Sequence, residues 1–270
     1  MALAYANGRS IAFTDTGGDG PAVILGHGYF LDNSMFADVA ALVPEYRIIA
    51  PDARGHGDSA DDGVAFTYWD SAKDVLGLMD VLGLRRATVG GVSQGGFTAL
   101  RVALLAPRRV TSLVLFDTEA DAVSAETKAG YTELFDALRA NGPIDPIARP
   151  LATQLIGDFP PLVDEWVAKW QERGVERLPL GTPVECLLER DDIVPQLPAI
   201  QCPALLARGS EDASLPPERM ATLAQHLPRA SSVHTINGAA HSPPATHPQE
   251  VSALLREFLS GRMPCAEDDN

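Results

Sequence analysis

The sequence predicts an α/β fold in which helices cover both faces of a mostly parallel sheet. The first observation is that short apolar, β-branched runs alternate with amphipathic segments of helical length from residue 22 onward. The second is the repeated order of strand, helix and strand, which implies right-handed crossovers. The third is Asn7-Gly8 between two apolar runs, which predicts a hairpin and therefore an antiparallel pair at the edge of the sheet.

Eight strands and five core helices are predicted from local signals. The strands are Leu3–Ala6, Ile11–Asp15, Ala22–Leu25, Arg47–Ala50, Ala87–Val92, Thr111–Phe116, Ala204–Ala207 and Ser232–Ile236. Two helices begin at Ser34 and near Thr67, and the others cover Gln94–Ala106, Glu218–Leu227 and Gln249–Ser260. Pro44, Gly83 and Pro107 follow the first three helices and are typical stop signals.

This alternation stops between Glu119 and Pro198. That stretch contains no convincing strand, and its helical segments Ala125–Ala140, Ile147–Leu155 and Pro161–Glu172 are separated by Gly and Pro residues. We interpret residues 119–198 as a helical lid inserted into a core made of residues 1–118 and 199–261. Residues 262–270 are polar and acidic, and we expect them to form a disordered tail.

Composition limits the possible partners and cofactors. The chain carries 21 basic and 36 acidic residues, a net charge of −15, which disfavours binding to nucleic acid and to anionic lipids. The three cysteines are widely spaced without a CxxC, so neither a disulfide framework nor a structural zinc site is expected. No apolar run is long enough to cross a membrane, and no signal peptide is visible. We therefore expect a cytoplasmic protein that acts on a small molecule without metal or cofactor. Its oligomeric state stays open, with a homodimer as one alternative.

The strongest local motif is Gly91-Val92-Ser93-Gln94-Gly95. It lies directly between a predicted strand and a predicted helix, so Ser93 occupies a tight strand-to-helix turn. A serine in such a turn has a strained backbone, and its neighbours two positions away must be small. Ser93 is thus the candidate nucleophile, with a structural Gly-rich turn as the alternative.

Serine needs a base, and the chain offers six histidines. His241 lies in a loop of small residues just after the last predicted strand. Strand ends of a parallel sheet meet at one edge, so His241 and Ser93 are expected at the same edge. The other histidines fall in Gly-rich turns, in a strand or near helix ends, where structural roles explain them.

The base in turn needs a carboxylate to fix its tautomer. Asp212, in Gly209-Ser210-Glu211-Asp212, follows the seventh predicted strand, and its place between Ser93 and His241 in the chain fits this scaffold. Two alternatives stay open. Glu211 is adjacent, and Asp117 ends the neighbouring strand.

An acyl-transfer site also needs N–H donors for the developing oxyanion. The backbone N–H of Gln94 is one candidate. The second is that of Tyr29, in the loop Gly26-His27-Gly28-Tyr29 after the third strand. A dinucleotide fingerprint starting at Gly26 fails, because Leu31 stands where the third glycine belongs.

Together these residues resemble the α/β-hydrolase superfamily over nearly the whole chain. The resemblance covers His27-Gly28, the segment 52–59, the turn at Ser93, and the loops at Asp212 and His241. It implies an eight-stranded sheet with a helical lid after strand six. The branch it resembles contains 3-oxoadipate enol-lactonases, non-haem haloperoxidases and meta-cleavage C–C hydrolases.

Departures from the family pattern narrow the expected chemistry. Dehalogenases and epoxide hydrolases of the superfamily use an aspartate in place of Ser93, and perhydrolase-type relatives tend to have proline and methionine where this chain has Phe30 and Gln94. We expect hydrolysis of a small, moderately hydrophobic ester or lactone. C–C bond hydrolysis, perhydrolysis and ligand sensing by a receptor-like hydrolase are the alternatives. Phe30, Trp166 and Trp170 are expected to line the pocket, although both tryptophans could instead pack onto the sheet.

Overall fold

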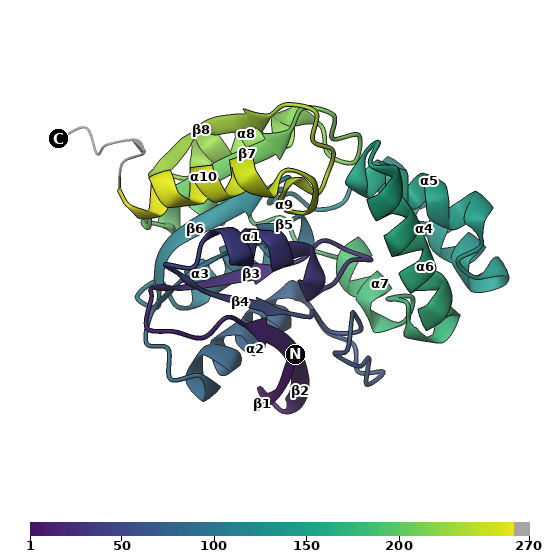
Figure 1. Ribbon diagram of the computed structural model, residues 1–270, viewed down its shortest axis with the longest axis horizontal. Helices are drawn as coiled ribbons and strands as arrows, with labels where there is room; N and C mark the ends of the chain where they lie inside the picture. Colours follow the sequence, from purple (N-terminus) through teal and green to yellow (C-terminus); the bar gives the residue numbers. More distant parts are fainter. Residues whose placement is uncertain (262–270) are drawn as a thin grey trace.

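The computed structural model describes residues 1–261, in which eight strands form one sheet (Figure 1). The strands are β1 (Ala2–Ala6), β2 (Arg9–Asp15), β3 (Ala22–Gly26), β4 (Arg47–Pro51), β5 (Ala87–Val92), β6 (Val110–Phe116), β7 (Ala204–Gly209) and β8 (Ala230–Ile236). Their order in the sheet is β1-β2-β4-β3-β5-β6-β7-β8. The predicted tail 262–270 and Cys265 lie outside the described residues.

The predicted sheet is confirmed, including its antiparallel edge. Asn7 and Gly8 have φ angles of 49° and 80°, which two-residue hairpin turns require. β1 pairs antiparallel with β2, and β2 pairs antiparallel with β4. The pairs from β4 to β8 are parallel. The carboxyl ends of these parallel strands therefore lie along one edge, where the chain can bring distant residues together.

Helices cover both faces of this sheet. One face carries α1 (Ala37–Leu42), α9 (Pro243–Thr246) and α10 (Pro248–Leu259), which contact one another, and the other carries α2 (Tyr68–Val81), α3 (Gln94–Leu105) and α8 (Pro217–His226). A short 3₁₀ turn, η1 (Asn33–Phe36), precedes α1. At the start of α2, Thr67 and Asp70 form a capping box, so this helix begins at the predicted residue.

The segment between β6 and β7 is helical, as predicted, and lies to the right in Figure 1. It contains α4 (Ala125–Asn141), α5 (Asp145–Ile156), α6 (Pro160–Arg173), α7 (Thr182–Leu188) and the 3₁₀ turns η2 (Val175–Arg177) and η3 (Val194–Ala199). The sequence does not predict α7, because Gly181-Thr182-Pro183 is one of the Gly and Pro interruptions that separate the predicted helical segments. Proline is compatible with the first turn of a helix, where its missing N–H leaves no bond unmade.

Among the described residues, no helix is both long and apolar enough to cross a membrane. The two cysteines that the structure describes are free. Cys186 is buried and Cys202 is half-buried, as expected of structural thiols.

Candidate active site

A strained turn between β5 and α3 holds Ser93. Its φ of 52° lies in the left-handed region, which serine adopts only where its surroundings enforce it. The Ser93 N–H donates to the Phe116 carbonyl at 3.0 Å, and the Ser93 carbonyl accepts the Thr118 hydroxyl at 2.7 Å. These bonds tie the turn to the end of β6, at the carboxyl edge of the sheet.

The glycines on both sides of Ser93 allow the turn to approach β3. A Cβ on Gly91 would lie 2.1 Å from the carbonyl oxygen of Gly26, and a Cβ on Gly95 would lie 2.0 Å from the same atom. Both distances are far below van der Waals contact. The requirement for small residues two positions from the serine is therefore a requirement imposed by the β3 backbone.

His241 and Asp212 form a hydrogen-bonded pair. The Nδ1 atom of His241 lies 3.0 Å from Oδ2 of Asp212, whose Oδ1 accepts the backbone N–H groups of Ser214 and Leu215 at 2.8 and 3.2 Å. Burial opposes ionisation of Asp212, but the facing imidazole and these donors outweigh it, so its pKa lies below the usual 3.8. An ionised Asp212 holds the proton of His241 on Nδ1 and leaves Nε2 able to accept another.

The two rival carboxylates have different surroundings. Glu211 is exposed. Asp117 is fully buried, with one oxygen within 4.8 Å of a carboxylate oxygen of Asp212 and of a ring nitrogen of His241. Within the described residues, His241 hydrogen-bonds to Asp212 and not to Asp117.

The loop after β3 holds the predicted oxyanion donor, Tyr29. His27 accepts the Ala53 N–H on Nε2 at 2.9 Å, so its proton lies on Nδ1, which donates to the Gly28 carbonyl at 2.8 Å. The Leu31 N–H donates to the same carbonyl at 3.1 Å. Because the Gly28–Tyr29 peptide is trans, the Tyr29 N–H points away from these donors. Within residues 1–261, no group accepts a hydrogen bond from the Tyr29 N–H.

The side chain of Gln94 is held by His56, so the backbone N–H is the group that this residue offers at the turn. Gln94 Nε2 lies 3.2 Å from Nε2 of His56, whose Nδ1 donates to the Arg54 carbonyl at 2.9 Å. Burial, together with the neighbouring His27, lowers the pKa of His56 to about 3, so this imidazole is neutral and accepts the Gln94 amide.

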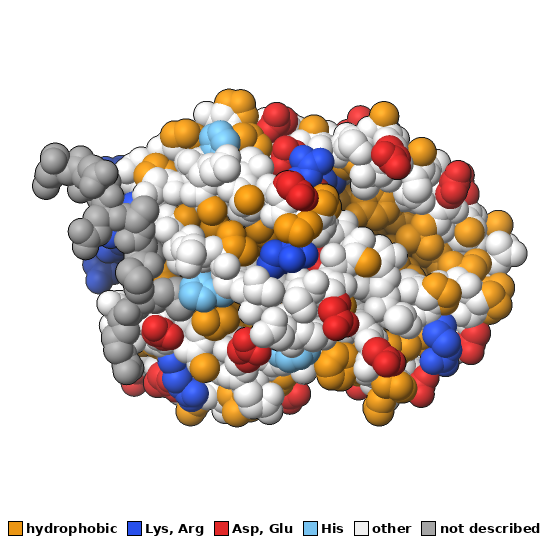
Figure 2. Space-filling model, turned by 90° about the horizontal axis from the view of Figure 1, so that it is seen from above, with side chains coloured by type: hydrophobic (Ala, Val, Ile, Leu, Met, Phe, Trp, Pro, Cys, Tyr) orange, Lys and Arg blue, Asp and Glu red, His pale blue; other side chains and the backbone are white. Residues whose placement is uncertain are grey.

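Ser93 and His241 line the same cavity, which has a volume of about 620 Å³. Within the described residues, no hydrogen bond joins the Ser93 hydroxyl to His241. More than half of the cavity wall is apolar, and α4 and α5 contribute many of its residues; examples are Leu134, Ile147 and Leu151. Figure 2 shows hydrophobic side chains gathered in a hollow on the side of the molecule where α4–α6 lie.

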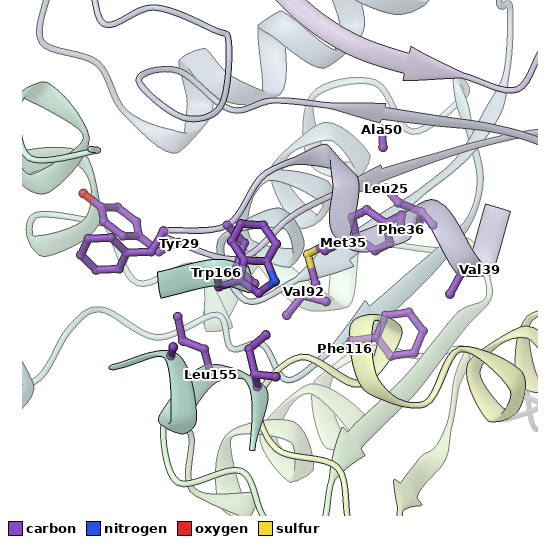
Figure 3. Packing of buried hydrophobic residues seen from close by; sticks show 14 of the residues in the cluster. Leu25, Tyr29, Met35, Phe36, Val39, Ala50, Val92, Phe116, Leu155 and Trp166 are labelled. Carbon is purple, nitrogen blue, oxygen red and sulfur yellow. The ribbon is translucent and has the colours of Figure 1, made fainter. Parts of the chain in front are cut away.

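Phe30 lines this cavity, as predicted, but Trp166 and Trp170 do not. Both tryptophans are at most 2% exposed and belong to the buried cluster that includes Met35 and Val92 (Figure 3). The indole N–H of Trp170 donates to the Phe30 carbonyl at 2.8 Å. The structure therefore supports the packing alternative for these two residues, because α6 turns them toward the loop after β3.

The sequence did not predict a group of charged side chains in the cavity wall. Arg190 pairs with Glu119, which also lies 3.2 Å from Arg219. All three side chains line the cavity. Glu119 and Arg190 are 71 positions apart, and no local pattern marks such a pair.

The chain is similar to known hydrolases and related proteins over most of its length. The chain is 29% identical over 194 residues to 3-oxoadipate enol-lactonase 1 of Acinetobacter baylyi, covering 71% of each chain. It is 29% identical over 282 residues to a non-heme chloroperoxidase of Streptomyces lividans, covering 94% of this chain and 97% of the relative. A thermophilic esterase from Thermogutta terrifontis, solved with malate bound, has a TM-score of 0.83 at 31% identity, and 94% of each chain is covered.

These relatives confirm the resemblance stated from the motifs. Esterases, enol-lactonases and other hydrolases are among the proteins that the chain is similar to. A model of the alpha/beta hydrolase fold matches residues 21–248. Because this match covers well over half of the sequence, the chain belongs to the α/β-hydrolase fold family.

Proposed function

We propose that this protein hydrolyses a small, moderately hydrophobic carboxylic ester or lactone, with Ser93 as nucleophile, His241 as base and Asp212 as the orienting acid. One observation carries the proposal. His241, which is hydrogen-bonded to the carboxylate of Asp212, and Ser93, which lies in a strained turn, line the same cavity, whose wall is more than half apolar. Esterase and enol-lactonase relatives support the same reaction class.

The reaction would proceed in two steps. His241 Nε2 takes the proton of the Ser93 hydroxyl while Oγ attacks the carbonyl carbon, and the N–H groups of Tyr29 and Gln94 stabilise the oxyanion. His241 then gives this proton to the leaving alkoxide. Water, activated by the same imidazole, attacks the acyl-enzyme and releases the acid.

The cavity supports the proposed substrate class. Apolar side chains, many of them from α4 and α5, form more than half of its wall, which favours an uncharged acyl or alcohol group. The charged group Glu119, Arg190 and Arg219 in this wall carries paired charges and favours a polar atom in the part of the substrate that contacts it. We assign residues 119–198 the role of a lid, because α4 and α5 contribute so much of the wall.

Turnover of aryl esters and lactones by Ser93→Ala tests the proposal. We expect kcat/KM to fall at least about a thousandfold, while Ser232→Ala, a change of an exposed serine on β8, retains wild-type rates. A fluorophosphonate should label Ser93 covalently, as read by peptide mass spectrometry. Undiminished turnover by Ser93→Ala would show that the nucleophile is assigned wrongly.

The chloroperoxidase relative favours one second candidate, perhydrolysis. Here hydrogen peroxide replaces water and attacks the acyl-enzyme, which releases a peracid and restores Ser93. Phe30 and Gln94 depart from the perhydrolase pattern, so we expect peracid formation to be slower than hydrolysis of the same ester. The amounts of peracid and of carboxylic acid formed in one reaction mixture distinguish perhydrolysis from hydrolysis.

A further inference from the structure

A second carboxyl group, that of Asp117, lies beside Asp212 and has no part in the mechanism above. Its side chain is fully buried, and its Oδ1 accepts the Gly209 N–H at 2.9 Å. Its Oδ2 is also buried and meets no N–H or O–H donor within the described residues. An ionised oxygen without a donor is strongly destabilising in a protein interior. The orphaned oxygen therefore needs an explanation.

Asp212 provides that explanation. The two carboxyl groups lie within 4.8 Å of each other and of His241, and two carboxylates so close cannot both ionise readily. Asp212 faces the imidazole and accepts two backbone N–H groups, whereas Asp117 accepts one. Burial and the charge of Asp212 raise the pKa of Asp117 well above 3.8, and the Gly209 N–H and Arg208 oppose this less. The proton belongs on Asp117.

We propose that Asp117 is a positioning residue whose protonated Oδ2 donates a hydrogen bond to the Asp212 carboxylate. Its Oδ1 stays bonded to Gly209, so Asp117 joins the end of β7 to the triad acid. This bond restricts rotation of Asp212 and leaves one negative charge beside His241. The inference rests on the proposed roles of Asp212 and His241, and it excludes Asp117 as their substitute acid.

Two substitutions separate a protonated from an ionised Asp117. Asparagine is neutral, tolerates the φ of 41° at this position, and can accept from Gly209 while donating to Asp212. Alanine removes both hydrogen bonds. We expect Asp117→Ala to lower kcat/KM about 10- to 100-fold. Asp117→Asn should instead keep kcat/KM close to the wild-type value.

The pH dependence of kcat/KM distinguishes a protonated Asp117 from an ionised one, which a loss of structure alone would not do. With Asp117→Asn the acidic limb of kcat/KM should keep its position, because one neutral group replaces another. If Asp117 were ionised, its removal would take a negative charge from beside His241 and move this limb down by more than about one pH unit. Such a shift would overturn the proposal.

Thermal unfolding tests the protonation state of Asp117 without an activity assay. Because the folded-state pKa of Asp117 is raised, the contribution of its proton to stability is fully present below about pH 3.8 and declines as pH rises toward the folded value. Asparagine has no such proton, so the Tm of Asp117→Asn minus that of wild type should grow from about pH 5 to about pH 8. Asp212, His241 and Arg208 face Asp117 in both proteins, so their contributions largely cancel in the Tm difference.

A Tm difference that stays flat or falls with pH overturns the proposal, whatever Asp117→Ala does. Failure of the proposed function looks different, because Ser93→Ala would then keep its activity. The Tm comparison can also be made in the Ser93→Ala background, where it reports the proton on Asp117 alone.

Discussion

At the scale of single residues, the charge on Asp212 decides which nitrogen of His241 carries the proton. Asp212→Asn should lower kcat by about 10⁴, because the amide can donate to Nδ1 and favour the tautomer whose Nε2 cannot accept from serine. The steady-state rate on an aryl ester measures this. Glu211→Gln is the matched control, since its exposed neighbouring side chain should be dispensable. A loss below about tenfold for Asp212→Asn would point to another acid.

How far these residues could be predicted depends on how local their signals are. Ser93 is marked by its own turn and by the glycines around it. His241 and Asp212 follow from strand ends that converge at one edge of a parallel sheet. The sequence favours Asp212 but leaves Asp117 open as the alternative, because both follow neighbouring strands. The choice between them depends on which oxygen comes within 3.0 Å of the imidazole, and this is a property of tertiary packing.

At the scale of elements, α6 is fastened to the loop that carries Tyr29. Trp170 donates to the Phe30 carbonyl, and the Tyr29 hydroxyl donates to the Pro179 carbonyl at 2.6 Å. Arg173 and Lys169 pair with Asp32 at 2.6 and 3.1 Å. The helical segment and the loop after β3 therefore form one connected unit, and we expect a change in α6 to affect the proposed oxyanion donor, the Tyr29 N–H.

Trp170→Phe tests this connection, because it keeps an aromatic ring and removes the N–H that holds the Phe30 carbonyl. We expect kcat to fall about tenfold with little change in KM, since the oxyanion forms after the substrate binds. Trp166→Phe is the control on the same helix, because no hydrogen bond of its indole is recorded within residues 1–261. Equal losses in both variants would mean that packing, and not this bond, matters.

Asp32 should make the same junction sensitive to acid. Burial opposes its ionisation, but the Ser34 hydroxyl, Lys169 and Arg173 outweigh burial and lower its pKa. A lowered folded-state pKa means that the stabilisation is present above about pH 3.8 and is lost as pH falls. Asp32→Asn should therefore destabilise the protein by about 2 kcal/mol at pH 7, and the Tm difference from wild type should shrink below pH 4. A difference independent of pH would exclude the charge as its cause.

The helices between β6 and β7 show where prediction from sequence reaches its limit. Their helical character was predicted from apolar periodicity, and α4, α5 and α6 begin and end within about two residues of the expected positions. The direction that each face takes was not predictable, because it depends on partners elsewhere in the chain. Trp166 and Trp170 share the expected face of α6, yet that face meets the loop after β3 and not the cavity.

At the scale of the whole molecule, the helices α4–α7 share a hydrophobic cluster with one face of the sheet. Phe135, Leu151 and Trp166 belong to the same buried cluster as Val23 and Phe116 of the strands. This explains how the α4 and α5 wall can hold a defined shape over Ser93. The division into a core and a lid at residues 119 and 198 stays a prediction, and the shared cluster indicates that the two parts unfold together.

A cavity closed by this wall should select substrates by length. Each methylene moved from water to an apolar wall contributes about 0.8 kcal/mol, so kcat/KM should rise roughly fourfold per carbon along a series of aryl esters until about 620 Å³ is filled. Ile147→Trp narrows the cavity from α5 and should lower kcat/KM for a hexanoyl ester at least about tenfold while an acetyl ester loses less than about threefold. Ile144→Trp is the matched control, because its exposed side chain at the start of the same helix does not line the cavity. Equal losses for both esters, or the same selectivity from Ile144→Trp, would mean that this wall does not measure the acyl chain.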